Sequence, residues 1–298
     1  MHAFQYEAPD SLTEVISLLG RHGGKVRLLA GGTDLIDQMR VGRLRPELVV
    51  DIKKLPELNV LARDATGMHI GAAVPCYRVQ AAEEIQQHFP AIADSCNIIG
   101  GIQIQSRASL GGNVCNSGPA ADSTPSLIAL GAVCVIAGPQ GTREVAVENF
   151  CTGPGKNVLQ PGELLVEFRL PQPLPHSGSH YRRMIPRNEM DIAVVGVGAS
   201  LQLDASGHVI QAARVALGAV APTPLLATAV NELLANQPLN DQTLERAAQA
   251  ARQVVAPITD MRGTKEYRIH VTGVLVRRVL QAAATRARGA PLDYRPGH

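Results

Sequence analysis

Two glycine-rich segments carry the residues best suited to holding an anionic ligand. The first is Leu28-Leu29-Ala30-Gly31-Gly32-Thr33-Asp34, in which an apolar run leads into paired glycines and a residue able to cap a helix. A strand that enters such a turn and then a helix leaves several backbone N–H groups free and convergent, which is what a phosphate group needs. An ordinary strand–helix turn has the same pattern, so this segment alone leaves both interpretations open.

The second segment, Ser109 to Ser123, is too long and too rich in small residues for a simple turn. The side chains of Asn113 and Asn116 can form hydrogen bonds to a ligand, and Asp122 can accept them from sugar hydroxyls. A flexible surface loop is the alternative interpretation. Two such segments in one domain favour a cofactor that contains a pyrophosphate.

Other ligand-binding and catalytic motifs have weak support. Gly196-Val197-Gly198-Ala199-Ser200-Leu201 lacks the third glycine of a dinucleotide fingerprint and lies inside a strand-like run. The chain has no His-Glu-x-x-His motif and no Gly-x-Ser-x-Gly elbow. The sequence therefore argues against a Rossmann enzyme and against the common hydrolases.

The cysteines do not form a metal-binding pattern. Their number is odd, and no two lie within four residues of each other: Cys76, Cys96, Cys115, Cys134 and Cys151. Structural metal and iron–sulfur sites normally draw on closely spaced pairs. We therefore expect reduced thiols and no metal in this chain, with any iron–sulfur cluster located in another chain.

Composition limits the partners and the cellular location that we expect for this protein. The chain has 28 Lys and Arg against 26 Asp and Glu, a balance that argues against nucleic acid as a partner. Its longest apolar run, Leu127 to Gly138, is too short to cross a membrane, and the N-terminus lacks the basic and apolar regions of a secretory signal. We expect a cytoplasmic protein.

Aromatic side chains are scarce: the chain has 4 Phe, 5 Tyr and no Trp. A planar ligand would therefore lie between aliphatic side chains.

Hydrophobic periodicity and turn signals place these segments on secondary structure. A capping box at Ser11 predicts a helix that ends near residue 23, and Thr33 is the expected N-cap of a second helix. Further strands are expected at 26–30, 49–52, 68–74, 133–137 and 163–170, with helices at about 79–96 and 127–131. The Pro-rich stretch from Pro171 to Gly178 indicates a domain boundary. Beyond it we expect strands at 181–184, 192–203 and 209–217, then helices at 224–235, 243–255 and 264–287, an α+β order.

The residues of both segments resemble the flavin subunit of the molybdenum hydroxylases, the xanthine dehydrogenase and carbon monoxide dehydrogenase family. Residues 30–35 resemble the family's Ala-Gly-Gly-Thr-Asp-Leu element, and residues 109–113 its second FAD element. The similarity continues in order through residues 152–156, 217–224 and 260–268. It is strongest to the separate FAD subunit of bacterial xanthine dehydrogenase-type enzymes.

The resemblance implies an α+β architecture. A two-lobed FAD-binding domain of the p-cresol methylhydroxylase type would cover residues 1–175, with lobes at about 1–55 and 56–175. A smaller C-terminal flavoprotein domain, a three-stranded antiparallel sheet packed on helices, would cover 176–288. Residues 289–298 would form a tail.

The implied activity is that of an oxidoreductase subunit that transfers electrons. A molybdopterin subunit would oxidise the organic substrate, and an iron–sulfur subunit would carry the electrons across [2Fe–2S] clusters. FAD on this chain would pass them to an acceptor, in many relatives NAD⁺. The assembly would be a dimer of heterotrimers. Because the flavin supplies the chemistry, this chain needs no catalytic acid, base or nucleophile.

The resemblance also implies the residues that contact the cofactor. The pyrophosphate would lie on the backbone of Leu28, Leu29, Ala30, Gly31, Gly32, Thr33 and Asp34. The phosphates, ribityl chain and ribose would contact Ala108, Ser109, Gly112, Asn113, Asn116 and Asp122. Ile99, where some relatives have Phe, and Leu165 would enclose the flavin ring. Lys156 and Arg187 are candidates for a cation at its N1 edge, and an exposed basic residue is the alternative for each.

Two other functions stay open. A stand-alone flavin reductase of the UDP-N-acetylmuramate dehydrogenase type has a comparable first loop, and a scaffold subunit without cofactor would need neither glycine-rich segment. The segments at 109–122 and 262–268 favour the molybdenum hydroxylase subunit. The organic substrate and the final electron acceptor do not follow from the sequence.

Overall fold

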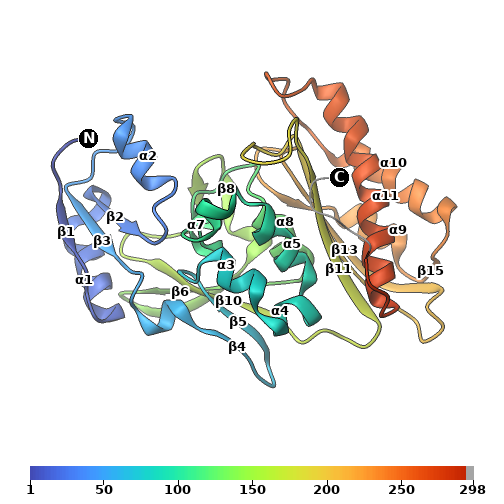
Figure 1. The fold of residues 1–298 in the computed structure, drawn as a ribbon, viewed down its shortest axis with the longest axis horizontal. Coiled ribbons are helices and arrows are strands. Elements are labelled where there is room, and N and C mark those ends of the chain that lie inside the picture. Colours follow the sequence, from blue (N-terminus) through green and yellow to red (C-terminus); the bar gives the residue numbers. More distant parts are fainter. Residues whose placement is uncertain (293–298) are drawn as a thin grey trace.

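The computed structural model describes residues 1–292. Three blocks follow one another along its longest axis, in the order of the sequence (Figure 1). Two blocks form the first part of the chain up to the Pro-rich stretch, and the third begins with β11 (Ser177–Met184). The predicted boundary at residue 175 falls between β10 (Leu164–Pro171) and this strand, and the domain limits themselves stay a prediction.

The N-terminal lobe is a small parallel sheet with a helix on it. Its strands are β1 (Gln5–Glu7), β3 (Leu48–Asp51) and β2 (Val26–Leu29), in that spatial order. Helix α1 (Leu12–His22) begins as the capping box predicts, because the Ser11 hydroxyl accepts a hydrogen bond from the N–H of Glu14. Val15, Leu18, Leu48 and Val50 form the buried contact between helix and sheet. The lobe also contains α2 (Leu35–Arg40) and 3₁₀ turns at Gly23–Lys25 and Pro56–Asn59.

The middle block is built on an antiparallel sheet. Its spatial order is β4 (Leu61–Arg63), β5 (Gly67–Gly71), β10, β6 (Val133–Gly138) and β7 (Gly141–Ala146). Short helices cover it: α3 (Cys76–Ala81), α4 (Glu83–His88), α5 (Pro90–Ile98), α6 (Ile102–Gln105), α7 (Leu110–Cys115) and α8 (Ser123–Ala129). A 3₁₀ turn at Val147–Asn149 precedes the small hairpin of β8 (Cys151–Gly153) and β9 (Lys156–Asn157).

Two local predictions in these blocks are wrong. The expected helix at 79–96 is three helices, α3, α4 and α5. Pro90 accounts for the second break, because it has no N–H to continue a helix and instead begins α5. Thr33 does not cap α2, since that helix starts later, after Asp34, and has no side-chain cap. The first turn of α2 therefore lacks the side-chain acceptor that the sequence led us to expect.

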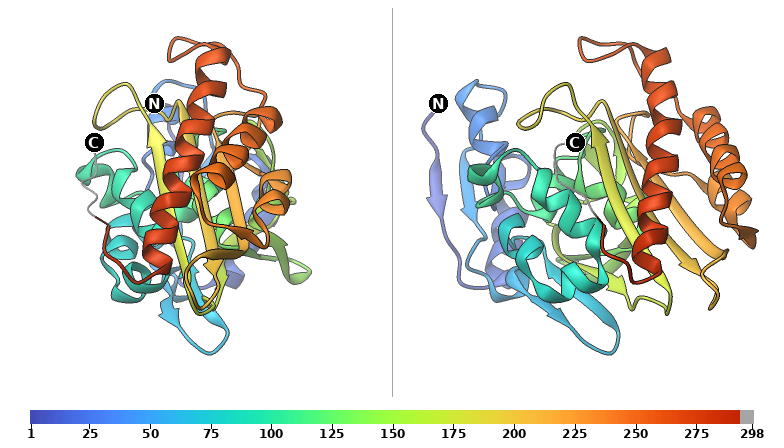
Figure 2. Two further views of the ribbon diagram at one scale, coloured as in Figure 1. Left: turned by 90° about the vertical axis from the view of Figure 1, so that its right-hand side faces the viewer. Right: turned by 45° about the vertical axis from the view of Figure 1, so that its right-hand side comes forward.

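The C-terminal block is a sheet covered on both faces. Strands β11, β12 (Val195–Leu203) and β13 (Val209–Gly218) form the expected antiparallel sheet, extended by the short β14 (Leu225–Leu226) and β15 (Gln237–Pro238). Figure 2 shows α9 (Thr228–Leu234), α10 (Asp241–Val254) and α11 (Lys265–Ala287) on the outer face. Helices α5 and α8 of the middle block contact the inner face, which makes this sheet the junction between the two domains.

Glycines allow helices to pack closely on both faces of the C-terminal sheet. A Cβ at Gly198 would lie 2.6 Å from the carbonyl oxygen of Pro125 on α8, and one at Gly178 would lie 2.1 Å from that of Ala283 on α11. Real side chains do not approach backbone so closely, so both positions need glycine. The Gly196–Gly198 pair that resembles part of a dinucleotide fingerprint therefore serves packing.

A buried polar cluster also joins the domains. Arg286 on α11 donates to both carboxylate oxygens of Asp94 on α5, at 2.6 and 2.8 Å, and to the carbonyl of Ser179. Nδ1 of His180 on β11 lies 2.7 Å from the same carboxylate. Burial raises the pKa of Asp94, but the hydrogen bonds from Arg286 and His180 outweigh it and hold the pKa below its usual value. The cluster fixes α11 against α5.

Candidate functional site

A cavity of about 610 Å³ lies between the N-terminal lobe and the middle block. The two glycine-rich segments face each other across it, and the sequence-predicted residues that line it are Leu28, Ala30, Gly31, Gly32, Thr33, Asp34, Ile99, Ala108, Ser109, Gly112, Asn113 and Asn116. We call this cavity the cradle. Segments about 80 residues apart in sequence thus meet at one site, as two separate binding loops for one ligand would.

The first segment presents hydrogen-bond donors to the cradle. Within residues 1–292, the backbone N–H groups of Gly31, Gly32, Thr33 and Asp34 donate to no protein acceptor. Gly32 has a φ of +77°, a left-handed conformation that turns the chain from β2 toward α2. Unpaired N–H groups that converge at the start of a helix suit an anionic oxygen.

Gly31 brings the two halves of the cradle together. A Cβ at this position would lie 2.0 Å from the carbonyl oxygen of Arg107, two residues before the second segment. The glycine is therefore required by the contact between the two loops and not by a ligand directly. Gly111 has a similar role, because a Cβ there would lie 2.4 Å from the carbonyl oxygen of Ala72.

The second segment forms a short helix. Ser109 caps α7 by accepting a hydrogen bond from the N–H of Gly112 at 3.1 Å, and this turn is ordered where a flexible loop was the alternative. The carboxamide oxygen of Asn113 accepts from both the N–H and the hydroxyl of Ser123, at 3.2 and 2.6 Å. This fixes the amide group of Asn113 and leaves its NH₂ as a donor. Ile99, Ile104 and Ala108 add an apolar wall.

Some expected cofactor residues lie outside the lining of the cradle. Leu29 belongs to β2, and Leu165 is buried in the core of the middle block with 4% of its surface exposed. Lys156 is exposed, although its neighbour Gly155 lines the cradle. The side chain of Arg187 is 66% exposed and pairs with Asp191 at 3.7 Å. Their roles toward a cofactor stay predictions.

Asp122 is buried in a polar network that the sequence did not reveal. Its carboxylate accepts from the hydroxyl of Tyr181 at 2.9 Å and from Nη1 of Arg183 at 2.6 Å. Arg183 also donates to the carbonyl of Ile98, next to Ile99 of the cradle wall, and only 4% of its side chain is exposed. Burial raises the pKa of Asp122 to about 6, although Arg183 and Tyr181 both favour the ionised form. Arg183 is thus a buried cation in contact with the residue that precedes Ile99 of the cradle wall.

Further lining residues were not predicted. They are Arg27, Leu35, Gln38, Leu44, Ile104, Cys115 and Gly155. Gly155 reaches the cradle because its N–H donates to the carbonyl of Ser117, and Asn157 donates to that of Cys115. These bonds dock the β8–β9 hairpin on the second segment. The similarity at residues 152–156 was the available signal for this contact.

The cysteines are free thiols distributed through the middle block. Burial raises the pKa of Cys115 to about 12, so this thiol stays protonated at neutral pH although it lines the cradle. In the part of the chain that the structure describes, no three His, Cys, Asp or Glu side chains are grouped as a metal site requires. Likewise, no helix between residues 1 and 292 is both long and apolar enough to cross a membrane.

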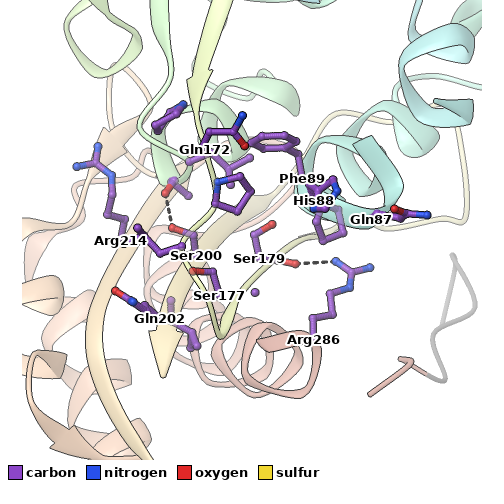
Figure 3. A pocket seen from close by; sticks show the side chains of 18 of the residues that line it. Gln87, His88, Phe89, Gln172, Ser177, Ser179, Ser200, Gln202, Arg214 and Arg286 are labelled. Atoms are coloured by element: carbon purple, nitrogen blue, oxygen red, sulfur yellow. Dashed lines mark hydrogen bonds between the residues drawn. The ribbon is translucent and has the colours of Figure 1, made fainter. Parts of the chain in front are cut away.

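Another cavity, of about 590 Å³, lies at the junction of the two domains (Figure 3). Its charged side chains already have partners: Arg286 donates to Ser179 and Asp94, and Arg214 donates to Ile128 and Glu148. Ser200 donates to the carbonyl of Ala129. The charged groups that line this cavity are therefore bonded within the protein, unlike the N–H groups of the cradle.

The fold and the cradle together define a two-domain protein with a cavity between its first two blocks whose unpaired N–H groups suit an anionic ligand. The chain matches the family described as the FAD binding domain in molybdopterin dehydrogenase over residues 2–173, and the CO dehydrogenase flavoprotein C-terminal domain over residues 179–283. It belongs to this family, whose members are FAD-binding subunits of molybdenum hydroxylases. The predicted α+β fold and the identification as an oxidoreductase subunit that binds FAD are confirmed.

Relatives are similar over nearly their whole length. The xanthine dehydrogenase FAD-binding subunit of Escherichia coli O157:H7 is 37% identical, over 95% of this chain and 97% of that protein. The carbon monoxide dehydrogenase medium chain of Hydrogenophaga pseudoflava is 31% identical, over 95% of this chain and 98% of its own. A solved structure of carbon monoxide dehydrogenase from Hydrogenophaga pseudoflava superposes with a TM-score of 0.92 at 30% identity, covering 96% of this chain and 98% of that one.

Proposed function

We propose that the chain carries FAD in the cradle and passes electrons from [2Fe–2S] clusters of an iron–sulfur subunit to an external acceptor such as NAD⁺. The observation that carries this proposal is the set of unpaired N–H groups at residues 31–34, opposite the fixed amide of Asn113. Bound there, FAD supplies the redox chemistry, because a flavin can exchange both electron pairs and single electrons.

The residues of the chain bind and orient the cofactor. The N–H groups of Gly31 to Asp34 hold the pyrophosphate, and Asn113 and Asn116 donate to its sugar and phosphate oxygens. Ile99 and Ala108 keep water from one side of the site. Asp122, with Arg183 held against it, contributes a fixed charge pair behind this wall. Lys156 and Arg187 remain candidates for a second cation, brought close by movement of their exposed side chains.

The partners follow from the family. The relatives named above are a FAD-binding subunit and a medium chain, and the matched carbon monoxide dehydrogenase structure is of a form that lacks the Mo-pyranopterin moiety of its molybdenum cofactor. We propose that this chain assembles with an iron–sulfur subunit and a molybdopterin subunit as a dimer of heterotrimers in the cytoplasm. The domain limits at 175 and 288 belong to the same proposal.

Purification of the complex from its native host tests the proposal. We expect a yellow protein with one FAD per chain, and mass spectrometry should find iron–sulfur and molybdopterin subunits in equal amount. Reduction by the organic substrate of the complex should then be followed by formation of NADH. FAD without partner subunits, together with NADPH oxidation, would indicate the UDP-N-acetylmuramate dehydrogenase type. Partners without FAD would indicate a scaffold subunit.

A further inference from the structure

A small cavity at the open edge of β11 is lined by four arginines. Arg182 and Arg183 come from the strand, Arg187 from the loop that follows it, and Arg278 from α11. The cavity has a volume of about 210 Å³, and no carboxylate is among the described residues that line it. We call it the arginine pocket. Within residues 1–292 it shares no lining residue with the cradle.

The fold brings these side chains together from separate elements. Neighbouring residues of a strand point to opposite faces of the sheet, so Arg182 and Arg183 leave β11 on different sides. Arg183 faces Asp122 of the middle block, and the opposite face of β11 packs on α11, which carries Arg278. Asn188 and Ile98 complete the rim next to Arg187. The pocket is therefore formed jointly by β11, the loop that follows it and α11.

Arg278 is the one arginine of the pocket whose charge has no partner within residues 1–292. Asp122 pairs with Arg183 and Asp191 pairs with Arg187, both carboxylates lying outside the lining. Arg278 makes no hydrogen bond or ion pair with the residues that the structure describes, whereas its neighbour Arg277 donates to Asp241 at 3.0 Å. A cleft lined by one sign of charge concentrates the potential and raises the local concentration of oppositely charged ions.

From this geometry we propose that the arginine pocket binds a phosphate group. Guanidinium groups bind the oxygens of phosphate in pairs, and arginines from several directions can contact its different oxygens. Pockets for whole organic ligands usually exceed about 300 Å³, so this one suits a single phosphate and leaves any attached group outside. The ligand is either inorganic phosphate or the phosphate of a soluble monoester. The site adds a second anion-binding function and does not depend on the one proposed for the cradle.

Calorimetric titration of the FAD-saturated protein with inorganic phosphate, at constant ionic strength, tests this inference. Saturation with FAD removes the N–H groups of the cradle as competing sites. We expect saturable binding with one phosphate per chain. Arg278→Ala should weaken it by about tenfold or more, since a hydrogen bond to a charged group is lost. Arg278→Lys, which keeps the charge but loses the paired donors, should lie in between.

Arg277→Ala is the matched control. It removes the same charge one residue away on the same helix, but its guanidinium pairs with Asp241 and does not line the pocket. Phosphate affinity should stay at the wild-type value in this variant. Competition by AMP would assign a phosphate monoester to the pocket, and failure to compete would assign inorganic phosphate. Absence of saturable binding, or an equal loss in Arg277→Ala and Arg278→Ala, would overturn the inference.

Discussion

Nη1 of Arg183 donates to the carboxylate of Asp122 across 2.6 Å, and this ion pair joins two domains. Arg183 belongs to the C-terminal sheet, while Asp122 lies near the end of the second glycine-rich segment of the FAD-binding part. Both side chains are almost fully buried. The pair therefore ties the wall of the cradle to the neighbouring domain, and neither domain alone contains it.

Removal of one partner should destabilise the protein strongly. Asp122→Ala leaves the Arg183 guanidinium buried without its carboxylate, and we expect a loss of about 3–5 kcal/mol in the free energy of unfolding at pH 7. Urea unfolding of the FAD-free protein measures it. Arg187→Ala breaks the more exposed pair with Asp191 and should change stability by about 1 kcal/mol or less. Similar losses in both variants would show that burial of the Asp122 pair is not the cause.

The raised pKa of Asp122 has a consequence for stability against pH. The pKa of Asp122 is about 6 in the folded protein and 3.8 in the unfolded chain. At pH values between these two, the folded state binds one proton that the unfolded state has lost. The contribution of Asp122 to stability is therefore full below about pH 4 and is lost as the pH rises through about 6. Relative to Asp122→Asn, the wild type should lose up to about 3 kcal/mol between pH 4 and 7.

Urea unfolding of both proteins at several pH values checks this prediction. The difference between wild type and Asp122→Asn isolates the titration of this carboxyl from that of all others. A difference that grows in favour of the wild type as the pH rises would mean that Arg183, not burial, dominates the pKa of Asp122.

Arg183 should also influence the midpoint potential of bound FAD. Replacement by Leu removes a buried positive charge, and this loss disfavours added negative charge on a nearby cofactor. Arg183→Leu should lower the potential by about 30 mV or more, which is about 1.4 kcal/mol for a two-electron couple. Arg187→Ala should lower it less, because solvent screens an exposed charge. Spectroelectrochemical titration measures both, and an unchanged potential in Arg183→Leu would contradict the prediction.

Local patterns were enough to find the cradle. Gly31-Gly32 after an apolar run predicts a turn with free N–H groups, and Ser109 before two glycines marks a capped turn; the structure brings both to one cavity. These signals depend on neighbouring residues only. The capping box at Ser11 and the last helix, capped by Thr264, were likewise evident from local sequence.

Features that depend on tertiary contacts were not predictable in the same way. Asp122 and Arg183 are 61 residues apart, and the only local hint was that Tyr181 and Arg183 share one face of a strand. Gly196 and Gly198 resembled a ligand motif, but Gly198 serves the contact with Pro125. The break in the expected helix at 79–96 could have been read from Pro90, since proline cannot donate within a helix.

Gly31 provides a test of the contact between the two halves of the cradle. In Gly31→Ala the new Cβ would lie 2.0 Å from the carbonyl oxygen of Arg107, so the two segments must move apart. We expect at least about a tenfold loss of FAD affinity, because such a shift forfeits hydrogen bonds to a charged group. Gly20→Ala is the control: nothing lies within 4 Å of its Cβ, and in the exposed part of α1 alanine should stabilise the protein by about 0.5–1 kcal/mol. Fluorescence titration of the FAD-free proteins gives both affinities. Equal FAD affinity in the two variants would show that the Gly31–Arg107 contact does not set the geometry of the cradle.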